Sequence, residues 1–196
     1  MHLRTHCFLL AAVWIFAACE GDRSTDGKPA EATAPETHMT EQSLSAGSAL
    51  AENKETVLLF LAPECPLCQS YAPMLPALAD TLAGMNLPLT AVVSGTYYSM
   101  REAESYLSGH GLNIPLIRDT AFVLARRYGA VITPEAVLTD STGAAVYRGA
   151  IDNWAVSLGR KRPRPTAFYL TDAARNYRAG REIDPKTTDA VGCFIE

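Results

Sequence analysis

Apolar residues along this chain first form one uninterrupted run and then recur at helical and strand spacing. Residues 56–62 are continuously apolar over a strand's length, which is typical of a strand buried on both faces. Next, apolar side chains repeat every three to four positions and predict a helix that Gly84 ends: Leu67, Tyr71, Leu75, Leu78 and Leu82. Pro66 suits the first turn of this helix, whereas Pro73 and Pro76 lie inside it and predict a kink.

The same patterns continue to the end of the chain. We expect, in order, a strand over 87–94, an amphipathic helix over 99–109, a short apolar segment at 114–117, a helix capped by Asp119 and closed by Gly129, strands over 135–139 and 144–148 joined by a turn at 140–143, and a last helix capped by Thr166 and ended by Gly180. Strands that alternate with helices before a final hairpin and helix predict an α/β fold. Its mixed central sheet would be flanked by helices on both faces.

The first 18 residues predict a signal peptide. Residues 7–18 are apolar, too short a run to span a bilayer stably, and the small residues before Cys19 resemble a bacterial lipobox, although Phe16 stands where Leu is usual. The resemblance implies that Cys19 becomes the lipid-bearing first residue, and Glu20 after it favours the outer membrane, on the periplasmic face. An ordinary signal peptide cleaved nearby is the alternative.

Residues 19–53 predict a flexible tether between the lipid and the folded domain. From position 21 the segment is rich in Ala, Thr, Ser, Glu, Gly and Pro, and large apolar residues are scarce. Such a segment cannot bury enough surface to offset the entropy lost on ordering. We therefore expect one folded domain over residues 54–196.

Charge does not direct this chain toward nucleic acid. The formal net charge is −4, and the one basic run, residues 160–164, is short and broken by proline. A solvated loop is its simplest interpretation, and docking on an acidic partner is the alternative.

Cysteine spacing carries the chemistry. Cys7 leaves with the signal peptide, so the folded domain holds Cys65, Cys68 and Cys193. A close pair plus one more cysteine is not a structural disulfide framework. Zinc would need further ligands, yet beyond the signal peptide the histidines are His38 in the tether and His110 on an apolar helical stripe. We expect no resident metal or cofactor.

Two other meanings of a Cys-x-x-Cys pair also lack their companions. Haem attachment needs a histidine directly after the second cysteine, where Gln69 stands, and a peroxidatic cysteine at position 65 wants a threonine at position 62, which is alanine. Thiol–disulfide exchange remains, because the motif follows a buried strand and opens a helix. Cys65 would be the low-pKa nucleophile and Cys68 would resolve the mixed disulfide. An inert structural pair is the alternative.

Residues 60–68 resemble the active-site segment of thioredoxins. Pro73 matches that family's helix-kinking proline, and residues 132–134 resemble its cis-proline loop, which implies that the Thr133 backbone beside Pro134 receives a substrate strand. Segments 133–140, 147–153, 159–163 and 190–195 are similar to the redoxin (AhpC/TSA-like) branch of this fold. The resemblance covers roughly 54–196 and implies a thioredoxin-like three-layer sandwich. It also implies an exported thiol–disulfide oxidoreductase acting on exported protein thiols and disulfides, with an electron donor.

The chain departs from the thioredoxin pattern at two positions. Leu59 stands where thioredoxins place a buried aspartate that accepts the proton of the second thiol, so proton handling must differ. Glu64 replaces the usual tryptophan, and its charge is expected to oppose thiolate formation at Cys65.

Cys193 matches a C-terminal cysteine of the redoxin branch, and three interpretations stay open. It could complete the core, act as a third redox thiol with Cys65, or join the pair as a ligand for Cu(I). The alternative functions for the whole domain are accordingly a copper-binding metallochaperone, a peroxiredoxin-like peroxidase, or a catalytically silent interaction domain.

Overall fold

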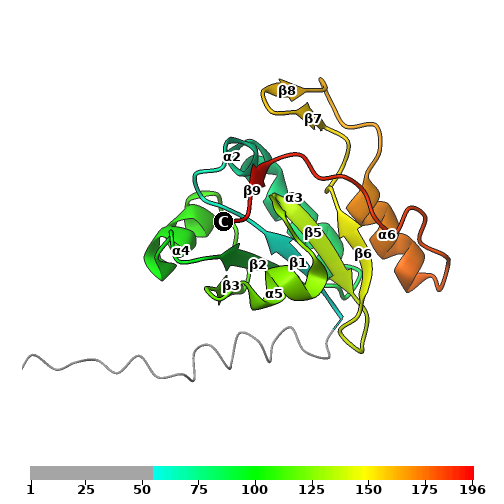
Figure 1. The fold of residues 1–196 in the computed structure, drawn as a ribbon. Coiled ribbons are helices and arrows are strands. Elements are labelled where there is room, and N and C mark those ends of the chain that lie inside the picture. Colours follow the sequence, from blue (N-terminus) through cyan, green and yellow to red (C-terminus); the bar gives the residue numbers. More distant parts are fainter. Residues whose placement is uncertain (1–54) are drawn as a thin grey trace, which may run out of the picture. The chain divides into compact units, whose positions relative to one another are not determined.

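A computed structural model describes residues 55–196. The predicted signal peptide, the lipid site at Cys19 and the tether lie outside the described residues. The elements (Figure 1) are β1 (Thr56–Phe60), α2 (Pro66–Tyr71), a 3₁₀ turn η1 (Ala72–Met74), α3 (Leu75–Ala83), β2 (Leu89–Ser94), α4 (Met100–Gly109), β3 (Leu116–Asp119), α5 (Val123–Tyr128), β4 (Ile132–Thr133), β5 (Glu135–Thr139), β6 (Ala145–Gly149), β7 (Ala155–Ser157), β8 (Arg160–Lys161), α6 (Tyr169–Arg178) and β9 (Cys193–Phe194).

The central sheet is mixed, as expected. Its strand order is β3-β2-β1-β5-β6. β1 is parallel to β2 and antiparallel to β5, while β2–β3 is parallel and β5–β6 antiparallel. β1 therefore lies at the centre, and all five of its residues are buried.

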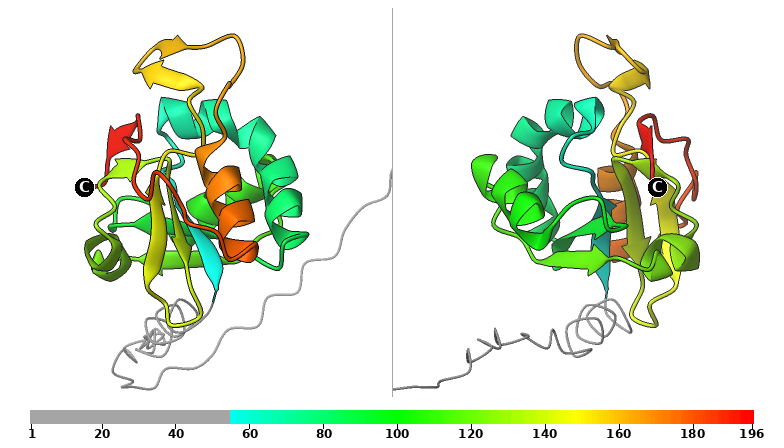
Figure 2. Two further views of the ribbon diagram at one scale, coloured as in Figure 1. Left: turned by 90° about the vertical axis from the view of Figure 1, so that its right-hand side faces the viewer. Right: turned by 60° about the vertical axis from the view of Figure 1, so that its left-hand side comes forward.

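Helices cover both faces of this sheet (Figure 2), which confirms the thioredoxin-like three-layer sandwich. Leu59 on β1 packs in a core cluster with residues of α2, α3, α4 and α6. Its neighbour Leu58 points the other way and packs in a second cluster with residues of α5. Because side chains alternate along a strand, an apolar residue at every position of β1 is what this two-sided burial requires. None of the helices in the described part of the chain is long and apolar enough to cross a membrane.

The kink predicted from the prolines is present in the first helical segment. Helical structure runs from Pro66 to Ala83, but Pro73 lies in the 3₁₀ turn that separates α2 from α3. A proline inside a helix lacks the N–H that would bond to the previous turn, so the helix bends there. The kink keeps the buried side chains of both halves on the same face of the sheet.

One predicted helix cap was confirmed and one was wrong. Asp119 ends β3 and caps α5, as predicted: its carboxylate accepts hydrogen bonds from the N–H groups of Leu124 and Ala125, although the helix itself begins at Val123. Thr166 does not cap α6, which begins three residues later, because the side chain of Asn153 already bonds both the N–H and the hydroxyl of Thr166. The predicted end of α5 is confirmed, with Gly129 in the left-handed region at φ 67°.

Candidate active site

Cys65 and Cys68 lie where the central strand passes into α2. Cys65 is the residue before the first turn, with Pro66 directly after it inside the helix, and Cys68 follows within α2. Only 3% of Cys65 and none of Cys68 is exposed. The backbone N–H of Ala62 donates to the Cys68 sulfur at 3.5 Å, which fixes the second thiol against the end of the strand.

Hydrogen bonds around Cys65 favour its ionised form. The side chain of Cys68 donates to it, as do the thiol of Cys193 and the backbone N–H groups of Leu67 and Cys68. Together they outweigh burial and lower the pKa of Cys65 to about 4. Glu64, whose charge was expected to oppose thiolate formation, is exposed, and the hydrogen bonds hold the pKa of Cys65 low beside it.

The pKa of Cys68 is shifted in the opposite direction. Burial, and then the hydrogen bond and charge of Cys65, raise its pKa well above the usual value. At neutral pH the pair thus holds one thiolate and one thiol, one turn of helix apart. Perturbed pairs of this kind mark candidate catalytic sites.

The position at which thioredoxins carry a buried aspartate is occupied here by an apolar core residue. Leu59 is fully buried in the same apolar cluster as Cys68. A buried carboxylate does adjoin α2 at another place: Asp152, which is 6% exposed, accepts a hydrogen bond from the hydroxyl of Tyr71 at 2.6 Å. Burial and then that bond raise the pKa of the Tyr71 hydroxyl. The hydrogen bond itself ties α2 to the loop after β6. Asp152 lies in the redoxin-like segment 147–153, but its spacing gives no sign of this contact with α2.

Thr133 and Pro134 stand beside the dithiol. The peptide bond between them is cis, as the resemblance implied. Thr133 is buried, and its carbonyl oxygen lies 3.2 Å from the Cys65 sulfur, which donates to it in the thiol form. The Thr133 backbone is already paired, however, because β4 forms an antiparallel ladder with β9 in which Thr133 lies opposite Cys193. A substrate strand could pair there only after β9 had moved away.

Cys193 belongs to this site. Its side chain hydrogen-bonds Cys65, and its pKa is raised to about 11 by burial first and then by that bond and the charge of Cys65. It packs against the edge of the core, is partly exposed and lines the cavity beside Cys65. Among residues 55–196 no three side chains of the His, Cys, Asp or Glu type are arranged to hold a metal ion.

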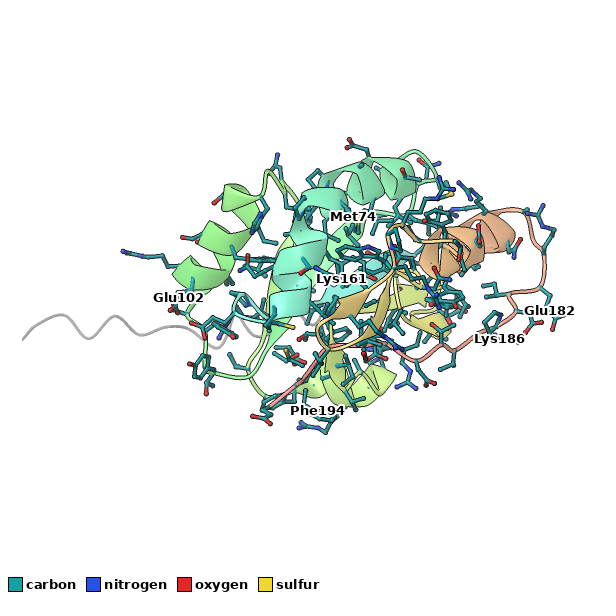
Figure 3. The ribbon with its side chains drawn as sticks, turned by 90° about the horizontal axis from the view of Figure 1, so that it is seen from above. Met74, Glu102, Lys161, Glu182, Lys186 and Phe194 are labelled. Atoms are coloured by element: carbon teal, nitrogen blue, oxygen red, sulfur yellow. The ribbon has the colours of Figure 1, made fainter. Side chains whose placement is uncertain are left out.

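A cavity of about 650 Å³ opens next to Cys65. The dithiol loop, the loop after β2 and the C-terminal segment form its walls. Its large side chains are mostly aromatic, namely Tyr97, Tyr98, Phe122 and Phe194. Tyr97 and Phe194 are 76% and 73% exposed, and Phe194 stands at the outer end of the C-terminal segment in Figure 3. These aromatics show no periodicity, and only the fold brings them together.

The remaining candidate residues have structural contacts. His110 lies against Tyr106 and contacts the side chain of Gln69 at 3.3 Å. Within the basic run, Lys161 (labelled in Figure 3) lies over the Trp154 ring and donates to Ser70 on α2 at 3.0 Å. Arg162 donates to the Asn153 carbonyl. Two of these charges thus hold the β7–β8 hairpin in place.

Two solved structures with a TM-score of 0.63 show the same fold. A hypothetical protein from Sinorhizobium meliloti 1021 is 21% identical over 76% of this chain and 82% of its own, with a TM-score of 0.63. An uncharacterized conserved protein from Geobacillus kaustophilus is 22% identical over 76% and 80%, with the same TM-score. A secreted Mycobacterium tuberculosis disulfide oxidoreductase homologous to E. coli DsbE is 22% identical over 67% and 85%, with a TM-score of 0.43. No curated protein matches this chain in sequence.

The family assignment rests on a longer sequence match. The model of the AhpC/TSA family matches residues 27–151, more than half of the chain, and this range includes the dithiol and the cis-proline loop. The fold and the family agree with the resemblance read from the motifs. The chain belongs to the AhpC/TSA family and is a thioredoxin-fold, redoxin-type oxidoreductase.

Proposed function

We propose that this redoxin is an exported, membrane-tethered thiol–disulfide oxidoreductase that exchanges disulfides through Cys65 and Cys68. The observation that carries the proposal is the opposite perturbation of two neighbouring sulfurs. The pKa of Cys65 is lowered to about 4, whereas burial raises that of Cys68. At neutral pH Cys65 is the thiolate that attacks, and Cys68 is held as a thiol until a mixed disulfide forms.

In the reaction, the Cys65 thiolate attacks one sulfur of a substrate disulfide. A bond forms between that sulfur and Cys65, the substrate disulfide breaks, and its second sulfur leaves as a thiolate. A resolving thiol of the enzyme loses its proton and attacks Cys65, which releases the first substrate sulfur. The substrate has then gained two electrons and the enzyme holds a disulfide, which a donor dithiol reduces. The same steps run backwards when the substrate is a dithiol.

The substrates would be exported proteins. The cavity beside Cys65 is wide and carries exposed aromatic side chains, which suits an irregular polypeptide segment with an apolar residue near its cysteine. Export and the lipid on Cys19 rest on the N-terminal sequence pattern, as does the periplasmic face of the outer membrane.

Insulin reduction tests the chemistry. With dithiothreitol as electron donor, a Cys19→Ser parent protein should speed the precipitation of insulin chains, and adding Cys65→Ser should return the rate to that of dithiothreitol alone. The parent itself is the matched control, because it carries the same substitution outside the domain. If the parent reduces no disulfide, or if Cys65→Ser matches it, thiol–disulfide exchange through Cys65 is wrong.

The same proteins separate the other functions that the sequence left open. Peroxide consumption that depends on Cys65, without insulin reduction, would replace the proposal with a peroxidase. Stoichiometric Cu(I) binding under reducing conditions, again without insulin reduction, would replace it with a metallochaperone.

Export is tested in cells. Wild-type protein should take up labelled palmitate and fractionate with the outer membrane, while Cys19→Ala should lose the label and leave the membrane fraction. Unlabelled wild-type protein in a soluble fraction would contradict the lipid anchor.

A further inference from the structure

The C-terminal segment of the chain occupies the backbone edge beside Pro134. β9 pairs with β4 so that Ile132 lies opposite Phe194 and Thr133 opposite Cys193, and the N–H of Ile195 donates to the Val131 carbonyl at 3.0 Å. In thiol–disulfide exchange this is where an incoming strand would bring its cysteine toward the nucleophile. Here the enzyme's own chain brings a cysteine there.

The C-terminal segment, residues 192–196, packs closely against the residues beside it. A Cβ atom added to Gly192 would lie 1.9 Å from the Thr133 carbonyl oxygen and 2.9 Å from the Ile132 side chain. One added to Gly95 would lie 2.7 Å from the carbonyl oxygen of Glu196. Both distances are shorter than any real Cβ contact, so only glycine permits the approach at either end of residues 192–196.

The packing of this segment brings the sulfurs of Cys65 and Cys193 near each other. Side chains of directly opposed residues in an antiparallel ladder lie on the same face, about 5 Å apart at their Cβ atoms. The Cys65 sulfur lies 3.2 Å from the carbonyl oxygen of Thr133, the residue opposite Cys193 in the ladder, and Cys193 and Cys65 both border the same cavity and are near enough to shift each other's pKa. Two cysteines placed in this way can be joined when their side chains rotate into disulfide geometry.

We propose that Cys193 is a second resolving thiol, which attacks Cys65 in the mixed disulfide in competition with Cys68. The inference rests on the proposed exchange chemistry and adds to it. In the step, Cys193 gives up its proton to solvent and its sulfur bonds to Cys65. The bond from Cys65 to the substrate sulfur breaks, and the substrate leaves as a thiolate that takes up a proton. The product is a Cys65–Cys193 disulfide, and the substrate has been reduced by two electrons.

Access and proton loss favour Cys193 over Cys68 for this step. Cys68 is fully buried, and Leu59 stands where a carboxylate would take its proton. Cys193 is partly exposed and lines the cavity, so water can take its proton. Burial is the largest cause of the raised pKa of Cys193, and the hydrogen bond and the charge of Cys65 are the other two. Both are lost once Cys65 is in a disulfide, so Cys193 becomes more acidic when it is needed.

Glutathione disulfide is the probe that separates the two resolving thiols. Four reduced proteins are compared: the Cys19→Ser parent and its Cys68→Ser, Cys193→Ser and Cys68→Ser/Cys193→Ser forms. Each is mixed with glutathione disulfide and quenched in acid, and its mass is measured by mass spectrometry of the intact protein. The double variant should accumulate a stable glutathione adduct on Cys65. Cys68→Ser should instead end as a Cys65–Cys193 disulfide, found by peptide mapping, and in Cys193→Ser the adduct should live at least tenfold longer than in the parent.

The two proposals fail in different ways. If Cys68→Ser keeps the glutathione adduct to the same extent as the double variant, Cys193 is no resolving thiol, although exchange through Cys65 stands. If the double variant forms no adduct, Cys65 is not the nucleophile and both proposals are wrong.

A variant that keeps Cys193 tests its placement. Gly192→Ala in the Cys68→Ser protein should displace β9 and restore the adduct of the double variant. Gly109→Ala is the matched control, because an added Cβ there meets nothing within 4 Å, and it should leave resolution unchanged. Resolution in Gly192→Ala as fast as in Cys68→Ser alone would overturn the role of the β4–β9 pair.

Discussion

Burial and ionisation act against each other at Cys65. Taking a thiolate out of water raises a pKa, yet the pKa of Cys65 falls to about 4 because its hydrogen-bond donors are already in place at the start of α2. The donors include two thiols, one from the same helix and one from β9. The thiolate of Cys65 is therefore stabilised by Cys68, its neighbour in the motif, and by Cys193, which lies far away in the sequence.

The alkylation rate of Cys65 should be almost independent of pH in the physiological range. An alkylating agent reacts with the thiolate, so the rate should stay level from about pH 8 to about pH 5 and halve near pH 4, where an ordinary cysteine halves near pH 8.5. Iodoacetamide labelling followed by mass mapping of the Cys65 peptide gives the profile. Cys68→Ala removes the strongest donor and should move the midpoint upward. A wild-type midpoint above pH 7 would contradict the hydrogen-bond account.

The Cys65–Cys68 disulfide should be a stronger oxidant than that of thioredoxin. The hydrogen bonds to the Cys65 thiolate exist only in the reduced form, so they stabilise the reduced pair and raise its potential. We expect a value less negative than about −270 mV. Equilibration of Cys193→Ser with glutathione buffers isolates this pair. A potential at or below that of thioredoxin would show that other groups stabilise the disulfide more.

Among the elements, those set by local sequence were the predictable ones. β5 has the predicted bounds because the apolar and β-prone residues 136–139 end at the Asp140 turn, and the helix kink follows from Pro73. β9 could not be predicted, because two residues carry no periodicity and its pairing with β4 joins positions sixty residues apart. The placement of Cys193 next to Cys65 follows from that pairing, so sequence alone left its role open.

The start of α4 offers a clean test of a locally encoded element. The hydroxyl of Ser99 accepts from the N–H of Glu102, and the Glu102 carboxylate accepts from the N–H of Ser99. Losing such a cap costs about 1 kcal/mol. Ser99→Ala should therefore lower the Tm by about 3 °C in thermal unfolding. Ser108→Ala, near the other end of the helix, is the control and should change Tm little. Equal shifts in both variants would contradict the capping role.

At the scale of the molecule, the described residues form a hydrophobic core of their own. Its apolar residues run from Val57 on the central strand to Ile183 after α6. Glu55 marks the beginning of the described part and is bound to α6, through the Tyr177 hydroxyl at 2.8 Å and Arg178 at 2.5 Å. These contacts hold the entry of β1 against the last helix.

A protein that starts at residue 54 should accordingly fold and work alone. It keeps Glu55 and every residue of the described core, so its Tm should lie within about 2 °C of the Cys19→Ser protein, which retains residues 19–53, and its insulin-reduction rate should be equal. Removing Glu55 as well takes away both bonds to α6. That deletion should lower the Tm further, because Tyr177 and Arg178 both lose their bond to the Glu55 carboxylate, and Arg178 keeps only its bonds to the carbonyls of Met85 and Asn86. A large loss of Tm in the protein that starts at 54 would show that residues 19–53 contribute to the fold, against the predicted tether.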